Sequence, residues 1–418
     1  MIERGINILI VGNGFDLAHG LPTKYMDFLH FCRRVQMIWM FGNREQSKMQ
    51  QNQSFQKKWL DNWDTAESIK DSIMTAFEKR EWKLVMPDWH IELDDKILSE
   101  IYGSVTDNTW YSYFNHICEL KSLKGENWID FESEIRYILQ RIDEKTNNLN
   151  DKISEIFEEI HKENDAKMNL FKKYYDKRSV NDDVKKDSLR AFRQIVYNDL
   201  ERIIRALELY LGKYVDEIEI DRRIPEIEEA KPDYVINFNY TNTYERVYNN
   251  ATVFHIHGAC DIARPFEKNN MVLGIDEYWG IDDRDTHTNF TIFKKFAQRI
   301  QKHTGIENYK YLNEINRFYE KNKERWTGNV DMNTTHPVGV SYVYIFGHSL
   351  DITDKDILSG FIGADSTSVI VYCYDKGVEG ELIASTIRLI GEEPLLKKVN
   401  SVPPKLNYII QGNQGLSY

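Results

Sequence analysis

Several kinds of feature are scarce in this sequence of 418 residues, and each scarcity excludes a class of protein. The four cysteines lie far apart and form no Cys-x-x-Cys pair (Cys32, Cys118, Cys260 and Cys373). We therefore expect neither a disulfide framework nor a structural zinc site. No apolar run approaches the length of a membrane span, and the amino terminus lacks the pattern of a secretory signal. The sequence thus predicts a cytoplasmic protein without a membrane partner.

An excess of basic charge is missing as well. The net charge is −12 and is spread along the chain, which argues against non-specific binding of nucleic acid. What the chain does contain is aromatic side chains, with 24 Tyr, 20 Phe and 9 Trp, and this content argues against disorder. The length is sufficient for a large core and for two or three domains.

The first thirty residues carry the clearest local pattern. Residues 6–11 (Ile-Asn-Ile-Leu-Ile-Val) are short and almost wholly apolar, which is typical of a strand buried on both faces of a parallel sheet. Gly12 and Gly14 then form a tight turn, and a helix starting near Phe15 would direct its amide end toward a phosphate. Two interpretations stay open at this point, an ordinary tight turn or a phosphate-binding loop. Asp16 can likewise cap the helix or contact a ligand.

Strand patterns return only late in the chain. Residues 25–230 are dominated by helical periodicity and predict no buried strand. Strands are predicted at residues 234–242, 253–258, 271–275, 342–346, 369–374 and 407–410, with helices at 351–361 and 379–390 between them. This alternation predicts an α/β fold with a doubly wound parallel sheet. Residues 1–24 and 231–418 would form it, with a large helical insertion at 25–230, and the first strand must join the later ones.

Four polar clusters follow the predicted strands, at residues 12–16, 237–242, 255–258 and 347–351. The carboxyl ends of the strands in a doubly wound sheet share one edge, and ligands bind there. Each cluster alone is compatible with ordinary turn chemistry. Their coincidence predicts one site at this edge.

Four segments resemble sirtuin motifs, in the same order along the chain. Gly12 to Pro22 resembles the NAD-binding glycine signature, and Asn239-Tyr240 resembles the Asn-x-Asp segment beside the nicotinamide ribose. His257-Gly258 resembles the catalytic His-Gly. Gly347-His348-Ser349-Leu350 resembles a further NAD-binding segment, Gly-x-Ser-Leu. The resemblance implies a Rossmann-like, sirtuin-like fold that binds NAD as substrate or ligand.

Over nearly its full length, the chain is similar to the AbiH family of bacterial abortive-infection proteins. The shared segments are the opening Gly-Asn-Gly-Phe-Asp-Leu-Ala-His-Gly-Leu-Pro-Thr, Trp-Ile-Asp-Phe-Glu at 128–132, Asn-Phe-Asn-Tyr-Thr at 237–241, His-x-His-Gly at 255–258 and Gly-His-Ser-Leu-Asp at 347–351. This resemblance implies phage defence, with a phage-derived trigger as a partner, while the nucleotide partner is implied by the sirtuin-like motifs. It brings no established reaction with it, and it leaves self-association into a homo-oligomer open.

The sirtuin resemblance has two departures, which decide the expected reaction. The chain has no counterpart of the four zinc-binding cysteines that help to hold the sirtuin peptide-binding domain. Thr241 occupies the place of the aspartate in Asn-x-Asp, and Asp16 the place of the serine in the first loop. Protein deacetylation is therefore not expected. Hydrolysis of NAD, as in sirtuin-like defence domains, requires fewer parts and is the predicted activity.

The predicted catalytic residues are Asn239 and His257. Cleavage of the nicotinamide–ribose bond develops positive charge on the ribose, so the site must orient the sugar and admit water. The amide of Asn239 can hold the ribose or a water, and the imidazole of His257 can act as a base. The remaining residues expected to bind the nucleotide, chiefly at its diphosphate and adenosine ribose, are Gly12, Asn13, Gly14, Phe15, Asp16, Pro22, Thr241, Gly347, Ser349 and Asp351.

Other interpretations of these residues remain open. His255 and His257 lie on the same face of one strand and could bind a metal together with Asp276 or Asp351, as in a metal-dependent nuclease. His257 could instead be a core histidine, and Asn239 a turn cap. Asp130 and Glu132 are interpreted as a helix start rather than as catalytic carboxylates. A non-catalytic sensor of NAD or ADP-ribose that acts through partners is the remaining functional alternative.

Overall fold

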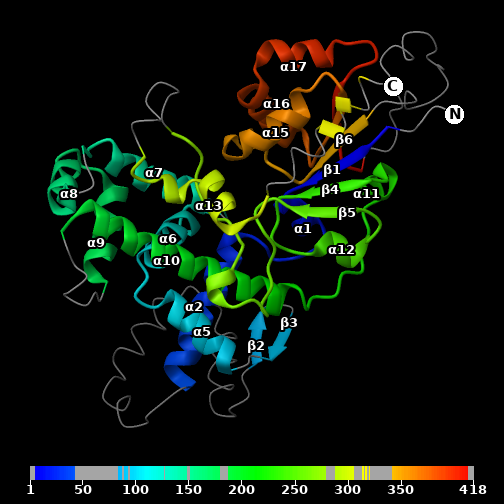
Figure 1. Ribbon diagram of the computed structural model, residues 1–418. Helices are drawn as coiled ribbons and strands as arrows, with labels where there is room; N and C mark the ends of the chain where they lie inside the picture. Colours follow the sequence, from blue (N-terminus) through cyan, green and yellow to red (C-terminus); the bar gives the residue numbers. More distant parts are fainter. Residues whose placement is uncertain are drawn as a thin grey trace. The chain divides into compact units, whose positions relative to one another are not determined.

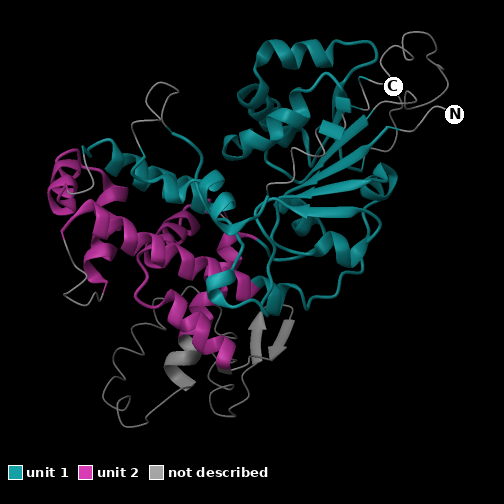
Figure 2. Cartoon of the chain, viewed as in Figure 1, with its two compact units in different colours: residues 1–23, 131–149, 211–418 teal, residues 24–130, 150–210 magenta. Residues whose placement is uncertain are grey.

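The structure is a computed structural model of the chain (Figure 1). It describes residues 5–42, 83–86, 89–92, 95–126, 128–147, 151–178, 187–278, 288–305, 313–314, 316–317, 320 and 341–412. The chain forms two compact units (Figure 2). Unit 1 comprises Met1–Thr23, Phe131–Leu149 and Leu211–Tyr418, and unit 2 comprises Lys24–Asp130 and Asn150–Tyr210.

Unit 1 is built on a six-stranded sheet in which every pair of neighbouring strands is parallel. The strands are β1 (Asn7–Val11), β4 (Tyr234–Asn237), β5 (Thr252–His255), β6 (Ser341–Phe346), β7 (Thr367–Cys373) and β8 (Leu406–Ile410). Their spatial order is β5-β4-β1-β6-β7-β8, so the first strand lies between two later ones. The predictions of an α/β fold with a parallel sheet and of a first strand that joins the later strands are confirmed. Numbered among themselves, the strands have the order 3-2-1-4-5-6, and the winding reverses between β1 and β6.

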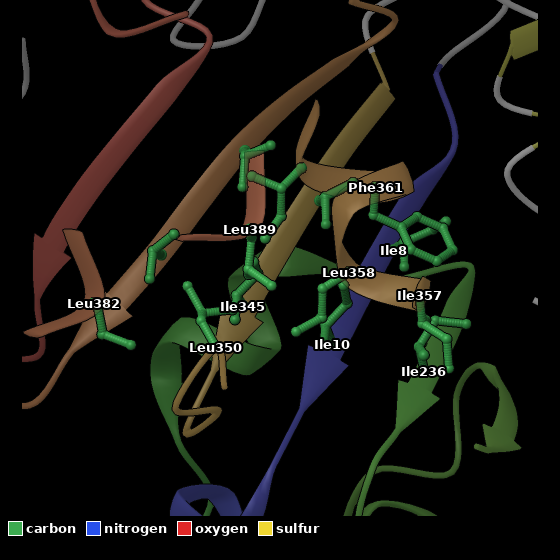
Figure 3. Close-up of a cluster of buried hydrophobic side chains, with 14 of the residues drawn as sticks. Ile8, Ile10, Ile236, Ile345, Leu350, Ile357, Leu358, Phe361, Leu382 and Leu389 are labelled. Carbon is green, nitrogen blue, oxygen red and sulfur yellow. The ribbon is translucent and has the colours of Figure 1, made fainter. Parts of the chain in front are cut away.

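Two hydrophobic cores lie on opposite faces of this sheet, because successive side chains of a strand point to opposite sides. Ile8 and Ile10 of β1 belong to one core, which includes Leu358 of α15 and Leu389 of α16 (Figure 3). Leu9 belongs to the other core, with side chains from α11 and α12. The helices of unit 1 are α1 (Asn13–Ala18), α7 (Phe131–Asp143), α11 (Pro225–Ala230), α12 (Thr243–Val247), α13 (Lys295–Lys302), α15 (Lys355–Gly363), α16 (Lys376–Ile390) and α17 (Glu392–Val399), with short helical turns at η1 (Leu211–Val215), η2 (Phe266–Lys268), η3 (Thr291–Phe293) and η4 (Ile352–Asp354).

Unit 2 is mainly helical. Its helices are α2 (Tyr25–Gly42), α5 (Asp95–Val105), α6 (Thr109–Ser122), α8 (Ile153–His161), α9 (Ala166–Lys177) and α10 (Leu189–Tyr210). Trp110 is fully buried against Phe114 and Phe171, and its indole nitrogen donates to the carbonyl of Val196 at 2.8 Å. An antiparallel pair, β2 (Lys83–Met86) and β3 (Trp89–Glu92), was not predicted. Among the helices described, none is long and apolar enough to span a bilayer.

One predicted strand is wrong. Residues 271–275 are buried and apolar, but only Ile275 makes an isolated bridge. The backbone of Leu273 is bound by the side chain of Gln298, which accepts from its nitrogen at 3.1 Å and donates to its oxygen at 3.0 Å. A buried side-chain amide thus satisfies backbone groups that a strand would pair in a sheet.

The boundaries of the two units also differ from the ranges expected for the insertion. Residues 131–149 and 211–230 group with the sheet. Contacts explain both segments: Glu132 of α7 forms an ion pair with Lys295, and Ile227 of α11 packs in the core of β1.

Candidate functional site

The loops that follow β5, β4, β1 and β6 lie at one edge of the sheet, because these four adjacent strands run parallel. The four polar clusters therefore come together, although β1 and β6 are more than three hundred residues apart in sequence. The glycine turn after β1 and the loop after β6 make direct contact. The amide of Gly14 donates to the carbonyl of Gly347 at 2.8 Å, and the amide of Gly12 donates to that of Phe346 at 3.2 Å.

The glycines of the first turn have a structural explanation. A Cβ atom at Gly14 would lie 2.7 Å from the Cα of Gly347, and one at Gly12 would lie 2.8 Å from the Cα of His348. Such distances require the backbone to move, so only glycine lets the two loops pack this closely. The amides of Gly12 and Gly14 are already engaged by the protein, and their predicted contact with a diphosphate stays a prediction. The Asn13 side chain accepts a bond from Thr23 at 2.5 Å, while Phe15 packs edge-on against Phe346.

Asn239 is held against the glycine turn. It follows β4 by two residues and is buried, and its side-chain nitrogen donates to the carbonyl of Gly12 at 3.0 Å. Its backbone amide donates to the side chain of Asn237 at 2.8 Å, and the Asn237 amide group also donates to the carbonyl of Thr241 at 3.1 Å. Asn237 therefore acts as the turn residue, and the amide of Asn239 is placed at the edge where β1 ends.

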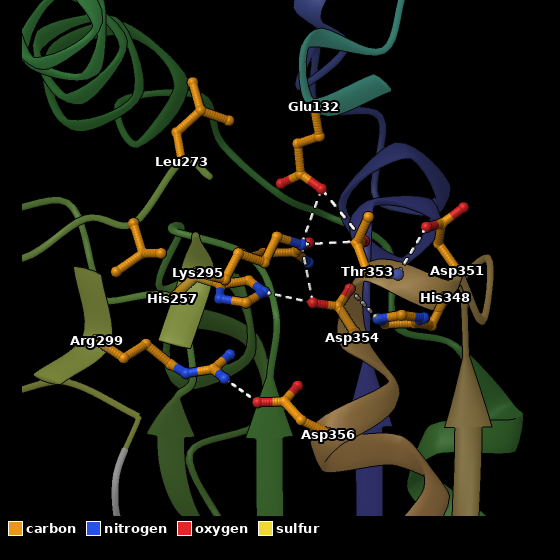
Figure 4. Close-up of polar contacts among 12 residues, drawn as sticks. Glu132, His257, Leu273, Lys295, Arg299, His348, Asp351, Thr353, Asp354 and Asp356 are labelled. Atoms are coloured by element: carbon orange, nitrogen blue, oxygen red, sulfur yellow. Dashed lines mark hydrogen bonds and ion pairs between the residues drawn. The ribbon is translucent and has the colours of Figure 1, made fainter. Parts of the chain in front are cut away.

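His257 belongs to a buried polar network in which Asp354 joins it to Lys295 and His348 (Figure 4). Its Nε2 is 3.0 Å from Oδ1 of Asp354, while its Nδ1 is buried and has no hydrogen-bond partner. The side chain is 5% exposed. Burial, together with the positive charge of Lys295, lowers the pKa of His257 to about 4, although Asp354 opposes this change. The imidazole is therefore neutral at neutral pH.

Lys295 joins two carboxylates in the same network (Figure 4). It begins α13 and is 3% exposed, and its Nζ lies 2.9 Å from Oδ1 of Asp354 and 2.8 Å from Oε2 of Glu132. Thr353 links the same groups, since its hydroxyl is 3.2 Å from the lysine and 3.3 Å from Glu132. Burial would lower the pKa of Lys295, but the two carboxylates outweigh it and raise that pKa above its ordinary value. Burial would raise the pKa of Asp354, but Lys295 and His257 hold it well below its usual range.

His348 completes this group from the loop after β6. Its Nδ1 accepts from the amide of Leu350 at 2.9 Å, and its Nε2 lies 3.7 Å from Oδ2 of Asp354. The ring of Phe238 packs edge-on against His348 and His257. The distance between ring centroids is 4.4 Å to His348 and 5.4 Å to His257. Phe238 lies in the loop after β4 and directly precedes Asn239, so the loops after β4, β5 and β6 meet around one aromatic ring.

Two aspartates lie at the turn η4 that follows the loop after β6, and they make different contacts. The side chain of Asp351 accepts from the amide of Thr353 at 2.9 Å and caps the turn η4. Asp354, three residues later, supplies the carboxylate that binds His257. Ser349 is exposed, and Leu350 beside it has φ of +55°.

A second polar group surrounds Asp16, on α1. Thr241 donates to Oδ2 of Asp16 at 2.7 Å, whereas Oδ1 is buried without a partner. Burial raises the pKa of Asp16 to about 6, against the opposing effect of hydrogen bonds from Thr241 and Thr243. A buried carboxylate oxygen without a partner is costly, by about 1–3 kcal/mol, so its retention beside the site calls for a ligand or a functional reason.

His255 does not share the partners of His257. Its Nδ1 is 3.1 Å from the carbonyl of Asn239, and its Nε2 is 2.9 Å from Oε1 of Glu245. Within the residues that the structure describes, no group of three or more His, Cys, Asp or Glu side chains is arranged to hold a metal ion. The alternative of a metal site with Asp276 or Asp351 therefore gains no support from the geometry of these side chains.

Sequence comparison gives one match. The sequence profile of the family described as bacteriophage abortive infection AbiH matches residues 8–373, which includes every cluster of the site. Neither the curated proteins nor the solved structures compared with the chain gave a match.

Proposed function

This chain belongs to the AbiH family of bacteriophage abortive-infection proteins, which act in phage defence, and we propose that it does so by hydrolysing NAD at the nicotinamide–ribose bond. Breaking this bond would remove a cofactor that the infected cell and the phage both need. The proposal extends the family's role to a specific reaction, and it rests on the chemistry at the edge of the sheet.

The strand order supports a nucleotide as the ligand. The order 3-2-1-4-5-6 is that of the Rossmann-like doubly wound fold, in which dinucleotides bind where the winding reverses. That place lies here between β1 and β6, whose loops carry Gly12, Gly14 and Gly347. Two of the four segments that resemble sirtuin motifs, Gly12 to Pro22 and Gly347 to Leu350, begin in these loops, so topology and resemblance favour the same position for the ligand.

The observation that carries the proposal is the hydrogen-bonding state of His257. Asp354 is anionic and accepts the proton of Nε2, so the lone pair of the neutral ring is on Nδ1. That nitrogen is buried and has no hydrogen-bond partner, as a base would be before its substrate arrives. A histidine with only a structural role would be expected to use both nitrogens.

The reaction that we assign to this arrangement is a simple hydrolysis. The bond between C1′ of the ribose and the nicotinamide nitrogen breaks, and nicotinamide leaves as a neutral molecule with the bonding electrons. A water oxygen adds to C1′, and its proton passes to Nδ1 of His257 and then to solvent, which gives ADP-ribose. Asn239 orients the ribose or the attacking water. Its nitrogen already binds the carbonyl of Gly12, so its side-chain oxygen is the atom that we expect to accept from the substrate.

The test is loss of NAD measured by mass spectrometry, with purified protein and in phage-infected cells. Wild type should form nicotinamide and ADP-ribose, and a chelator should not change the rate. His257→Ala and Asn239→Ala should each lower the rate, by on the order of a hundredfold or more for the base. His161→Ala, which alters an exposed histidine of unit 2, is the matched control and should retain full activity.

The outcomes separate the candidate functions. If wild type consumes no NAD even in infected cells, hydrolysis is excluded, and binding of NAD or ADP-ribose by calorimetry then tests the sensor alternative. Hydrolysis that persists in His257→Ala would instead show that the base is another group.

A further inference from the structure

The network around His257 contains two charged side chains, Lys295 and Glu132, in addition to the carboxylate that binds the imidazole. Asp354 alone can orient an imidazole, as a carboxylate does in other histidine sites. Here the same carboxylate oxygen, Oδ1, also binds a lysine at 2.9 Å, and that lysine binds a second carboxylate, Glu132. All of these groups come from elements far apart in the sequence.

We propose that Lys295 is a positioning residue of this site: it holds Asp354 as an anion, and Asp354 in turn keeps the proton of His257 on Nε2, so that Nδ1 takes up the proton in the reaction. This inference rests on the proposed hydrolysis of NAD. It assigns to Lys295 and Glu132 a part in the chemistry although neither needs to touch the substrate.

The first step of the argument is the tautomer of His257. A proton on Nδ1 would be a buried donor without a partner, and the lone pair of Nε2 would then face the carboxylate of Asp354 at 3.0 Å. Both consequences are unfavourable, because a buried donor without a partner has lost its hydrogen bonds to water and gained none in the protein. The proton therefore lies on Nε2 only as long as Asp354 remains an acceptor.

The second step is the ionisation of Asp354. A carboxyl group buried to this extent would ordinarily be protonated in part, and it could then donate to the histidine instead of accepting from it. The Nζ of Lys295 at 2.9 Å prevents this, because it favours the charged form. Glu132 at 2.8 Å keeps Lys295 charged in turn and balances the buried positive charge.

The third step concerns the charge felt by His257. The groups that face it or its partner are Asp354 of η4, Lys295 and Arg299 of α13, Glu132 of α7 and His348 of the loop after β6. Arg299 is itself paired with the carboxylate of Asp356. Burial is the largest cause of the low pKa of His257, and Lys295 is the neighbouring positive charge that lowers this pKa most.

The experiment removes this charge and measures the pKa of His257 directly. In protein with ¹³C-labelled histidine, the Cε1 signal of His257 is assigned by its absence in His257→Gln. In wild type the signal should titrate near pH 4. In Lys295→Met it should titrate higher by about one unit or more, since a nearby charge shifts a pKa by about 1–3 units. Lys295→Arg should restore the low value.

A second lysine offers a matched control. Lys294 is 2% exposed and forms an ion pair with Glu277 at 2.5 Å, and no contact joins it to Asp354 or His257 in the described residues. Lys294→Met should leave the titration of His257 unchanged. Should Lys295→Met fail to fold, the double variant Lys295→Met/Glu132→Gln removes one charge of each sign and preserves the net charge of the cluster, so the same shift is expected there.

The pH profile of kcat/KM for NAD is the functional readout. Its acid limb should rise in Lys295→Met in parallel with the histidine signal, and it should not move in Lys294→Met. A His257 signal that titrates at the same pH in wild type and in both Lys295→Met variants would overturn the inference and leave the lysine a structural role only. A shifted signal in a protein that never hydrolyses NAD would instead overturn the proposed function, while the electrostatic role of Lys295 would stand.

Discussion

The buried carboxyl of Asp16 predicts how the free energy of unfolding changes with pH. Its carboxyl is 1% exposed, and burial raises its pKa from 3.8 to about 6. A folded-state pKa above the unfolded value means that the native protein binds this proton more tightly than the unfolded chain does. The resulting stabilisation is present in full below pH 3.8 and is lost as the pH rises through about 6. Near neutral pH, the ionised Asp16 therefore destabilises the fold.

The magnitude follows from the shift of about two units, which corresponds to about 3 kcal/mol at about 1.4 kcal/mol per unit. Asp16→Asn removes the titration but keeps an oxygen that can accept the bond from Thr241, which spans 2.7 Å in wild type. The free energy of unfolding of the variant minus that of wild type should therefore increase by about 2.5 kcal/mol between pH 4 and pH 8, because the unfolded carboxyl is already more than half ionised at pH 4. Other titrating groups are common to both proteins, and most of their effects cancel in this difference.

Urea denaturation followed by circular dichroism at several pH values measures the difference. Thr241→Val is a useful second variant, because removing a hydrogen bond that lowers the folded-state pKa of Asp16 should extend the loss of stability to higher pH and enlarge it. A difference that is flat between pH 4 and pH 8 would refute the reasoning, since it would mean that the Asp16 carboxyl is solvated or paired in the native state.

Two further predictions concern the glycine turn and the cysteines. Gly14→Val should lower the free energy of unfolding by about 2 kcal/mol or more, because its Cβ would meet the backbone of Gly347 at 2.7 Å. Gly380→Ala, within α16 and with open space around it, should raise the free energy of unfolding by about 0.5–1 kcal/mol. Thermal melts compare the two variants, and a Gly14→Val protein as stable as wild type would show that the loops can separate freely. Elemental analysis after dialysis should find no bound zinc, and one zinc per chain that resists dialysis would contradict the expectation drawn from the scattered cysteines.

The sheet was the most predictable part of the fold. Residues 7–11 are apolar at almost every position because both faces of β1 are covered, and that pattern is visible without any partner. The run at 271–275 is just as apolar and just as buried, yet it is not a strand. Its backbone partner is the side chain of Gln298, and no local pattern indicates such a contact in advance.

The sequence could predict only those residues of the candidate site whose position follows from the topology of the sheet. Asn239 and His257 stand out because polar residues at strand ends must share an edge in a parallel sheet. Lys295 could not be recognised in the same way, because Lys294-Lys295 at the start of a helix has the appearance of a solvated basic pair. Its burial depends on two carboxylates from distant segments, Asp354 and Glu132. Such a network is specified by tertiary contacts alone.

The two departures from the sirtuin pattern lie opposite each other in the structure. In the resemblance to sirtuins predicted from the sequence, Asp16 stands in the place of the serine of the first loop, and Thr241 in the place of the aspartate of Asn-x-Asp. The hydroxyl of Thr241 donates to the carboxyl of Asp16 at 2.7 Å. A carboxyl and a hydroxyl group thus occupy this pair of positions in both patterns, with their places exchanged. Each difference alone removes a residue of the sirtuin motif, but the two differences together keep one carboxyl and one hydroxyl group at this pair of positions. Under the proposed function, we expect this pair to contact the nucleotide at the edge of the sheet, which would give the buried Asp16 a role.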